Sequence, residues 1–117
     1  MISPYVYAGL NNTKVHHDSP HILFEKLLSA VTKDFNMPPD VLLSRRRWRD
    51  CIYGRQLMAY ILRVHYRMTV MKIGRLLKRD HSTILHATKS HYNDYACVPE
   101  YREICNRIMI AVGIWPS

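Results

Sequence analysis

The chain has 117 residues, 48% of them hydrophobic, and its 17 Lys and Arg outnumber its 9 Asp and Glu to give a formal net charge of +8. This length fits a single domain and excludes the large nucleotide-binding and barrel folds. The excess of positive charge favours an anionic partner, either a nucleic acid or an anionic membrane surface.

The first part of the chain lacks hydrophobic periodicity, and we expect residues 1–18 to form a flexible N-terminal arm. Ser19 followed by Pro20 then predicts a helix start, with serine as the N-cap and proline at the first helical position. Apolar residues recur at helical spacing as far as Phe35, and the two prolines that follow end this helix. A single short turn is expected over residues 39–43.

A basic run, SRRRWRD at residues 44–50, comes next, and we expect it to form a loop or to lead into a helix. Its Trp48 is expected to seal the core rather than to stack on the loop. A second long helix is predicted after Gly54, where apolar residues recur at helical spacing: Leu57, Ile61, Val64 and Met68.

Two helices separated by a short interruption are predicted over residues 69–95. Thr69 can cap the first helix, whose inward residues are expected to be Val70, Ile73 and Leu76 or Leu77. The interruption, Lys78 to Asp80, ends with a suitable N-cap, because a carboxylate is favoured at the start of a helix. The second helix is expected from His81 to about Tyr95.

The last helix is predicted to open with Pro99, and it carries the clearest apolar stripe in the chain: Tyr101, Ile104, Cys105, Ile108, Met109 and Val112. No segment alternates as a strand does. We therefore expect an all-α fold with five main helices, forming one multi-helix domain over residues 19–113 and followed by a tail at 114–117.

The positive charge is concentrated in the middle of the chain. From Ser44 to His91 there are 12 basic and 2 acidic residues, a balance of +10, whereas the rest has 5 basic and 7 acidic residues, a balance of −2. A surface that serves only solubility mixes both signs. The segregation therefore favours a face that binds a polyanion.

The two helices of residues 69–95 have the form of a helix-turn-helix, in which the second helix enters the major groove with its N-terminus first. The residues at that position can form hydrogen bonds with base edges: Asp80, His81, Ser82 and Thr83. The alternative is that this polar run serves capping alone. The arginines of residues 45–49 suit a minor groove, where negative potential is focused, although a solvated or phosphate-binding loop is the alternative.

Catalytic and metal-binding patterns are absent from the sequence. His81, His86 and His91 follow at intervals of five residues, which turns each by about 140° from the last on a helix, so they do not share a face. No cysteine pair completes a zinc site, and no nucleotide-binding or hydrolase motif is present. We expect no enzyme activity, no metal ion and no cofactor.

The cysteines and the hydropathy of the sequence predict where the protein is located in the cell. The three cysteines form no CxxC pair and are expected to be reduced thiols. The sequence has no run of 18 apolar residues and no secretory signal pattern. We expect a cytoplasmic protein that associates with the nucleoid.

Residues 55–91 resemble the DNA-binding domain, domain IV, of the bacterial replication initiator DnaA. The most specific match is RDHSTILHA, residues 79–87, against the family's RDHTTVLHA. Leu42 to Arg47 resembles the family's basic loop, Arg55-Gln56 resembles the start of its following helix, and the similarity covers roughly residues 27–112. The resemblance implies a Trp repressor-like helical fold and, since the AAA+ ATPase domain is missing, a DNA-binding module that stands alone.

The resemblance also implies roles for single residues. Arg47 would insert into the minor groove, Asp80, His81 and Ser82 would face bases in the major groove, and Thr83 would meet a neighbouring phosphate or base. The phosphate-binding set would be Arg45, Arg46, Arg55, Gln56, Arg63, Lys78 and Arg79, with Lys78 standing near the family's usual glycine pair. The implied partner is double-stranded DNA with a DnaA-box-like site, in replication initiation or its regulation.

Two other functions remain open from the sequence. A protein-interaction adaptor could use the same helices to contact an acidic partner or other replication proteins, but it has no need of the polar run at residues 79–83. An RNA-binding regulator is the third possibility, and the sequence contains no aromatic platform of the kind that such domains use.

Overall fold

The computed structural model describes residues 19–115, in which six α-helices and one π-helical turn occur and no strand. The elements are α2 (Pro20–Phe35), α3 (Pro39–Leu42), α4 (Arg49–Tyr60), η1 (Ile61–His65), α5 (Val70–Leu77), α6 (His81–Cys97) and α7 (Pro99–Ala111). The expected all-α fold is confirmed. The expected N-terminal arm, residues 1–18, lies outside the described residues.

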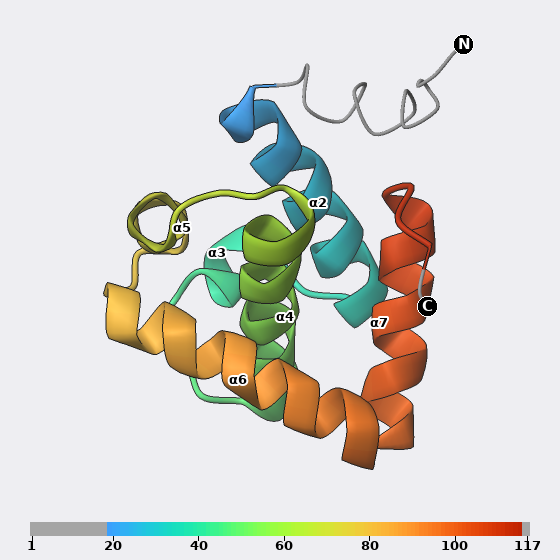
Figure 1. Ribbon diagram of the computed structural model, residues 1–117. Coiled ribbons are helices and arrows are strands. Elements are labelled where there is room, and N and C mark those ends of the chain that lie inside the picture. Colours follow the sequence, from blue (N-terminus) through green and yellow to red (C-terminus); the bar gives the residue numbers. More distant parts are fainter. Residues whose placement is uncertain (1–18, 116–117) are drawn as a thin grey trace, which may run out of the picture.

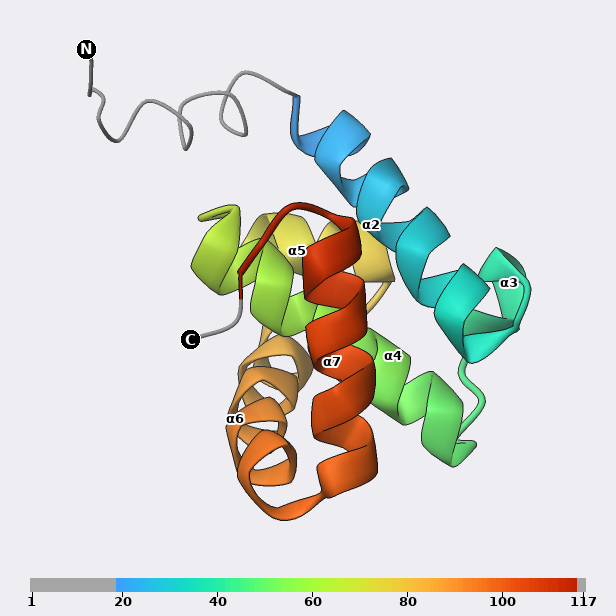
Figure 2. The same ribbon diagram turned by 90° about the vertical axis from the view of Figure 1, so that its right-hand side faces the viewer.

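The helices gather around α4, which stands at the centre of the molecule (Figure 1). The helix α6 packs across α4, and α5 packs against the first part of α6. The view from the side shows α7 lying beside α6 and α2 (Figure 2). This arrangement leaves the start of α6 and the loop before α4 on the surface, while the middle of α4 is enclosed.

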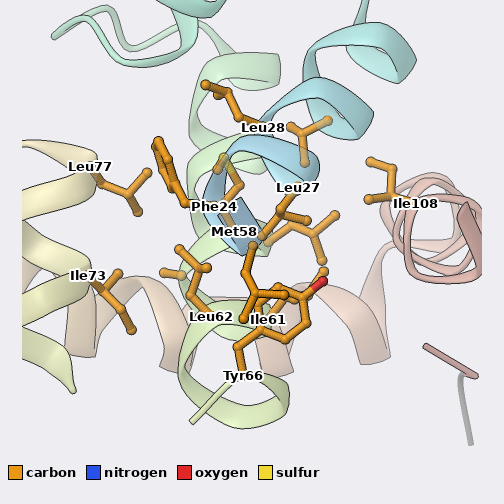
Figure 3. Close-up of a cluster of buried hydrophobic side chains, with 14 of the residues drawn as sticks. Phe24, Leu27, Leu28, Met58, Ile61, Leu62, Tyr66, Ile73, Leu77 and Ile108 are labelled. Carbon is orange, nitrogen blue, oxygen red and sulfur yellow. The ribbon is translucent and has the colours of Figure 1, made fainter. Parts of the chain in front are cut away.

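The hydrophobic core lies between α2, the α4–η1 segment, α5 and α7 (Figure 3). The side chains of Leu27, Leu57, Ile61 and Ile73 are fully buried there, one from each of four elements. Burying such a side chain contributes roughly 1.5–3 kcal/mol relative to leaving it exposed. The core thus fixes α5 against η1, at the end of the central helical segment, which places the turn that leads into α6.

Three side-chain caps set the starts of helices. Ser19 Oγ accepts from the Ile22 N–H at 3.2 Å, and Thr69 Oγ1 accepts from the Lys72 N–H at 3.2 Å. The Asp80 carboxylate caps α6, which runs two residues past the expected end at Tyr95. The predicted helix starts at these caps are confirmed.

The predicted start of the second long helix was wrong. Helix α4 begins at Arg49, so Gly54 lies inside the helix and is buried. A Cβ atom at this position would lie 2.7 Å from Leu42 Cδ1, so the missing side chain lets α3 pack closely on α4. The glycine therefore serves packing between helices, and it does not break the helix.

The apolar stripe of this helix was also partly wrong, because it assumed regular α-helical spacing. The Tyr66 N–H donates to the Ile61 carbonyl at 3.0 Å, five residues earlier, which makes η1 a π-helical turn. The wider turn rotates the following side chains, so Val64 is 41% exposed while Leu62 is fully buried. Met68 is buried as expected.

Trp48 does not seal the core. Its side chain is 60% exposed, and the Arg46 guanidinium carbon lies 4.8 Å from the centroid of its ring. Leu42 of α3 and Cys51 of α4, both fully buried, belong to the core on either side of this loop. In the tail, Ile114 packs against the core and Trp115 is exposed.

Candidate nucleic-acid interface

The turn between α5 and α6 is tight and depends on a close approach of two backbone segments. The Arg79 N–H donates to the Gly74 carbonyl at 2.8 Å, and Lys78 adopts a left-handed conformation with φ 59°. A Cβ atom on Gly74 would lie 2.5 Å from the Arg79 carbonyl oxygen. Only glycine fits here without movement of the backbone, so Gly74 sets the position of the start of α6 relative to α5.

The start of α6 is organised by the Asp80 carboxylate. Its Oδ1 accepts from the Thr83 N–H at 2.8 Å and from the Ser82 hydroxyl at 3.0 Å. These hydrogen bonds, the backbone bond first, hold the pKa of Asp80 below its usual range. His81, Ser82 and Thr83 are all exposed, so the first turn of α6 presents polar side chains to solvent.

The basic loop, residues 44–48, is held in place by arginines from two other parts of the chain. Arg55 of α4 donates to three carbonyl oxygens, those of Leu42 at 3.0 Å, Ser44 at 3.2 Å and Arg46 at 2.6 Å. Arg79 donates to Ser44 as well. Burial lowers the pKa of Arg55, and the charge of Arg79 lowers it further. The loop backbone is therefore fixed before any ligand binds.

A surface depression, which we name the α6 hollow, lies between the basic loop, α4 and α6. It has a volume of about 800 Å³. Seven of the predicted site residues line it: Arg45, Arg47, Arg55, Gln56, Arg79, Ser82 and Thr83. Two loop arginines thus face the hydroxyl side chains of α6 across one open space.

A second depression, which we name the turn hollow, lies between α5 and the start of α6 and has a volume of about 580 Å³. Four of its lining residues are cations: Arg45, Arg75, Lys78 and Arg79. Asp80, His81 and Thr83 also reach it, together with Met71, whose side chain is exposed. Because Arg45 and Thr83 border both hollows, the two form one continuous surface.

Residues 24–90 match the family model described as the bacterial DnaA protein helix-turn-helix. The chain belongs to this family. The bacterial DnaA helix-turn-helix is a DNA-binding domain, and the matched residues contain the basic loop, all of α5, α6 as far as Ser90 and the residues that line the two hollows.

Similar proteins carry the same family name. The chain is 38% identical over 78 residues to the chromosomal replication initiator protein DnaA of Mycoplasma pneumoniae, covering 65% of this chain and 17% of that protein. It is 35% identical over 66 residues to DnaA 2 of Protochlamydia amoebophila, covering 56% and 15%, and 39% identical over 61 residues to DnaA of Deinococcus deserti, covering 52% and 13%. The chain therefore spans less than a fifth of the length of these relatives.

Of the residues expected at the site of this DnaA helix-turn-helix, Arg46 and Arg63 line neither hollow, and Gln56 lines the α6 hollow but is almost entirely buried. Gln56 is only 3% exposed, and its Nε2 donates to Asp94 Oδ2 at 2.8 Å, so it joins α4 to α6 inside the fold. Arg63 is exposed on η1, which follows α4, whereas the basic loop precedes α4. Arg46 lies over Trp48.

Besides the buried Ile84, three further residues of α6 line the α6 hollow and were not predicted as site residues: His86, Ala87 and Ser90. Their spacing from Ser82 and Thr83 follows the helical repeat, so extending the polar face of α6 by two turns could have found them. Gly74 was missed as well. A glycine in the first helix of a helix-turn-helix signals close backbone contact, but the sequence does not say with which residue.

The histidines of α6 have different surroundings. His81 and His86 are exposed, whereas His91 is buried and its Nδ1 forms a 2.7 Å hydrogen bond with the Tyr101 hydroxyl. Within residues 19–115 no group of three His, Cys, Asp or Glu side chains is arranged to hold a metal ion. None of the helices in that range is long and apolar enough to cross a membrane.

Proposed function

We propose that this protein binds a short duplex DNA site of the DnaA-box kind, with the start of α6 in the major groove and Arg47 in the neighbouring minor groove. The observation that carries the proposal is the fixed position of the basic loop beside α6. Arg55 and Arg79 hold the loop backbone, and Arg47 lines the same hollow as Ser82 and Thr83. A protein that contacts two adjacent grooves of DNA must hold its two contacting segments, here the basic loop and the start of α6, at a fixed spacing.

The bases are read from the first turn of α6. His81, Ser82 and Thr83 are exposed, and each carries a group that forms hydrogen bonds with base edges. Asp80 can accept a hydrogen bond from a cytosine amino group while its other oxygen caps the helix. The sequence preference therefore rests on four consecutive residues at one helix end.

The phosphates are bound by the cations around the two hollows. Arg45, Lys78 and Arg79 border the turn hollow, and Arg75, which was not among the expected site residues, joins them. Arg46 and Arg63 are exposed and extend this positive surface. The phosphate contacts proposed for Arg55 and Gln56 are secondary to their roles inside the fold. Each neutralised phosphate releases counterions, so the affinity falls steeply with salt concentration.

The relatives, which are named chromosomal replication initiators, support the biological role that we propose. We place the protein at DNA sites used in replication initiation or its regulation, in the cytoplasm with the nucleoid and with replication proteins as possible partners. An adaptor that contacts only proteins would not require the polar start of α6, so substitution there separates the two functions.

The deciding experiment compares the dissociation constants of a DnaA-box duplex and a scrambled duplex of equal length over a series of salt concentrations. The expected result is tighter binding to the box, with His81→Ala reducing that preference by roughly 1–3 kcal/mol. Arg47→Ala should weaken box binding, and Lys33→Ala is the matched control, because it removes one exposed positive charge from α2 that lines neither hollow. Equal affinity for both duplexes would contradict sequence-specific binding.

A further inference from the structure

The basic loop carries an exposed aromatic side chain that the duplex proposal does not use. Trp48 is 60% exposed, and Arg46 lies over its ring at 4.8 Å from the centroid. Arg45 and Arg47 line the α6 hollow, whereas Arg46 and Trp48 do not. This alternation is that of an extended backbone, which sends successive side chains to opposite sides. The loop therefore has a second side, away from α6.

The second side borders its own depression, which we name the Trp48 hollow. It has a volume of about 350 Å³ and lies between the end of α2 and the start of α4. Its lining residues are Phe35, Asn36, Met37, Trp48, Arg49 and Asp50. Within the described part of the chain, Arg49 and Asp50 form no ion pair, and the Asn36 side chain makes no hydrogen bond.

The chemistry of this hollow matches a nucleotide. The indole ring offers a flat surface for a base, and Arg46, already placed over that ring, fixes its orientation. The Asn36 amide and the Asp50 carboxylate can bond the polar edge of a base, and the Arg49 guanidinium can bind a phosphate. An apolar peptide side chain would use the ring and Met37 but none of these polar groups.

We propose that the Trp48 hollow binds an unpaired nucleotide, so that the protein has a site for single-stranded DNA on the flank of its duplex-reading surface. The bases in a duplex are stacked on each other and cannot offer a face to the indole ring, whereas the bases of a single strand can. Arg46 and Arg49, both exposed on the Trp48 side of the loop, supply positive charge for the backbone of a single strand. The inference goes beyond the proposed duplex function and does not depend on it.

The test uses the intrinsic fluorescence of Trp48. The sequence has two tryptophans, so Trp115→Phe leaves Trp48 as the single reporter. Trp115 is exposed in the tail after α7, so its replacement leaves the fold intact. Titration with an oligothymidylate should quench the fluorescence of this variant, because a base stacks on the indole. Titration with a poly-glutamate peptide should not, and quenching by the peptide alone would assign the hollow to a protein partner and overturn the proposal.

The affinity of a labelled oligothymidylate is then measured for Trp48→Ala and Trp48→Phe, beside a labelled DnaA-box duplex. Trp48→Ala should lose about tenfold or more of its single-strand affinity. Trp48→Phe should keep most of it, since the ring remains. Duplex affinity should change by less than about twofold in both variants, as for a surface substitution outside the duplex site.

The failures of the two proposals are distinguishable. Absence of quenching by oligothymidylate with normal duplex binding overturns only the single-strand site. An equal loss of single-strand and duplex affinity in Trp48→Ala also overturns it, because Trp48 would then belong to the duplex-reading surface. Failure of the unmodified protein to prefer the box duplex, with oligothymidylate quenching intact, contradicts only the duplex proposal.

Discussion

Arg55 of α4 and Arg79 of the turn before α6 both donate hydrogen bonds to the carbonyl oxygen of Ser44. One backbone atom of the basic loop is thereby tied to the central helix and to the helix-turn-helix. A planar guanidinium can bond several acceptors at once in a fixed geometry, which a lysine cannot do. The two arginines thus act as one support between the loop and the start of α6.

The substitution Arg55→Lys distinguishes two roles of Arg55, support of the loop and contact with a phosphate. We expect Arg55→Lys to weaken duplex binding nearly as much as Arg55→Ala, by about tenfold, because both lose the bonds to the loop carbonyls. A phosphate contact alone would be largely restored by lysine, which keeps the charge. Amide hydrogen exchange at residues 44–48 should rise in both variants. Arg63→Lys is the control and should leave affinity and exchange unchanged.

Gly74 and Gly54 offer a matched pair of substitutions by alanine. The new methyl group on Gly74 meets the backbone oxygen of Arg79 at 2.5 Å, whereas that on Gly54 meets the flexible end of the Leu42 side chain at 2.7 Å. Each substitution stabilises its helix by about 1 kcal/mol, because alanine has a higher helix propensity than glycine. We expect Gly74→Ala to lower the free energy of unfolding by about 1–3 kcal/mol, and Gly54→Ala to lower it less. Urea denaturation measures both, and a larger loss for Gly54→Ala would contradict the argument.

The elements with local signals were predicted well from the sequence. The Ser19, Thr69 and Asp80 caps, and the proline that opens α7, act within three or four residues, so their effect can be read directly from neighbouring positions. The basic loop and the polar start of α6 were found for the same reason. The stripe of α7 keeps α-helical spacing, and four of its six residues are buried.

The errors have two causes, contacts between distant segments and a local change of helical spacing. Gly54 appeared to precede a helix because its role depends on Leu42, which approaches from α3. Val64 was placed inward because the π-helical turn changes the spacing without a sequence signal. The phosphate contacts of Arg55 and Gln56 stay predictions, but their bonds to the loop carbonyls and to Asp94 could not be foreseen, because they depend on how α4 packs. Such contacts follow from the tertiary structure alone.

The buried histidine of α6 should make stability depend on pH. His91 is 2% exposed, and burial lowers its pKa to about 4, aided by the charge of His65 and opposed by that of Asp94. It stacks on Tyr60, with ring centroids 3.8 Å apart, and bonds the Tyr101 hydroxyl. The unfolded chain binds a proton near pH 6.5, where folded His91 stays neutral. Stability is therefore complete above about pH 6.5 and falls as the pH drops towards 4, by at most about 3 kcal/mol.

The pH dependence is measured as the free energy of unfolding at several pH values between about 4 and 7. His91→Gln removes the titrating ring and keeps a group that can bond Tyr101, so its curve should be flatter even if its stability is lower. His86→Gln, an exposed histidine on the same helix, should keep the slope of the unmodified protein. Parallel curves for the unmodified protein and His91→Gln would assign the pH dependence to other groups.

Two substitutions of Asp80 distinguish helix capping from base reading. Asparagine caps a helix about as well as aspartate, whereas alanine costs about 0.5–2 kcal/mol at an N-cap. We expect Asp80→Ala to lower stability by that amount and Asp80→Asn to leave it nearly unchanged. The carboxylate only accepts hydrogen bonds, whereas an amide also donates, so Asp80→Asn should change the preferred base at one position of the site. Urea denaturation and selection of bound duplexes from a random pool measure the two effects separately. An unaltered site preference in Asp80→Asn would restrict Asp80 to capping, and the readout would then rest on His81, Ser82 and Thr83.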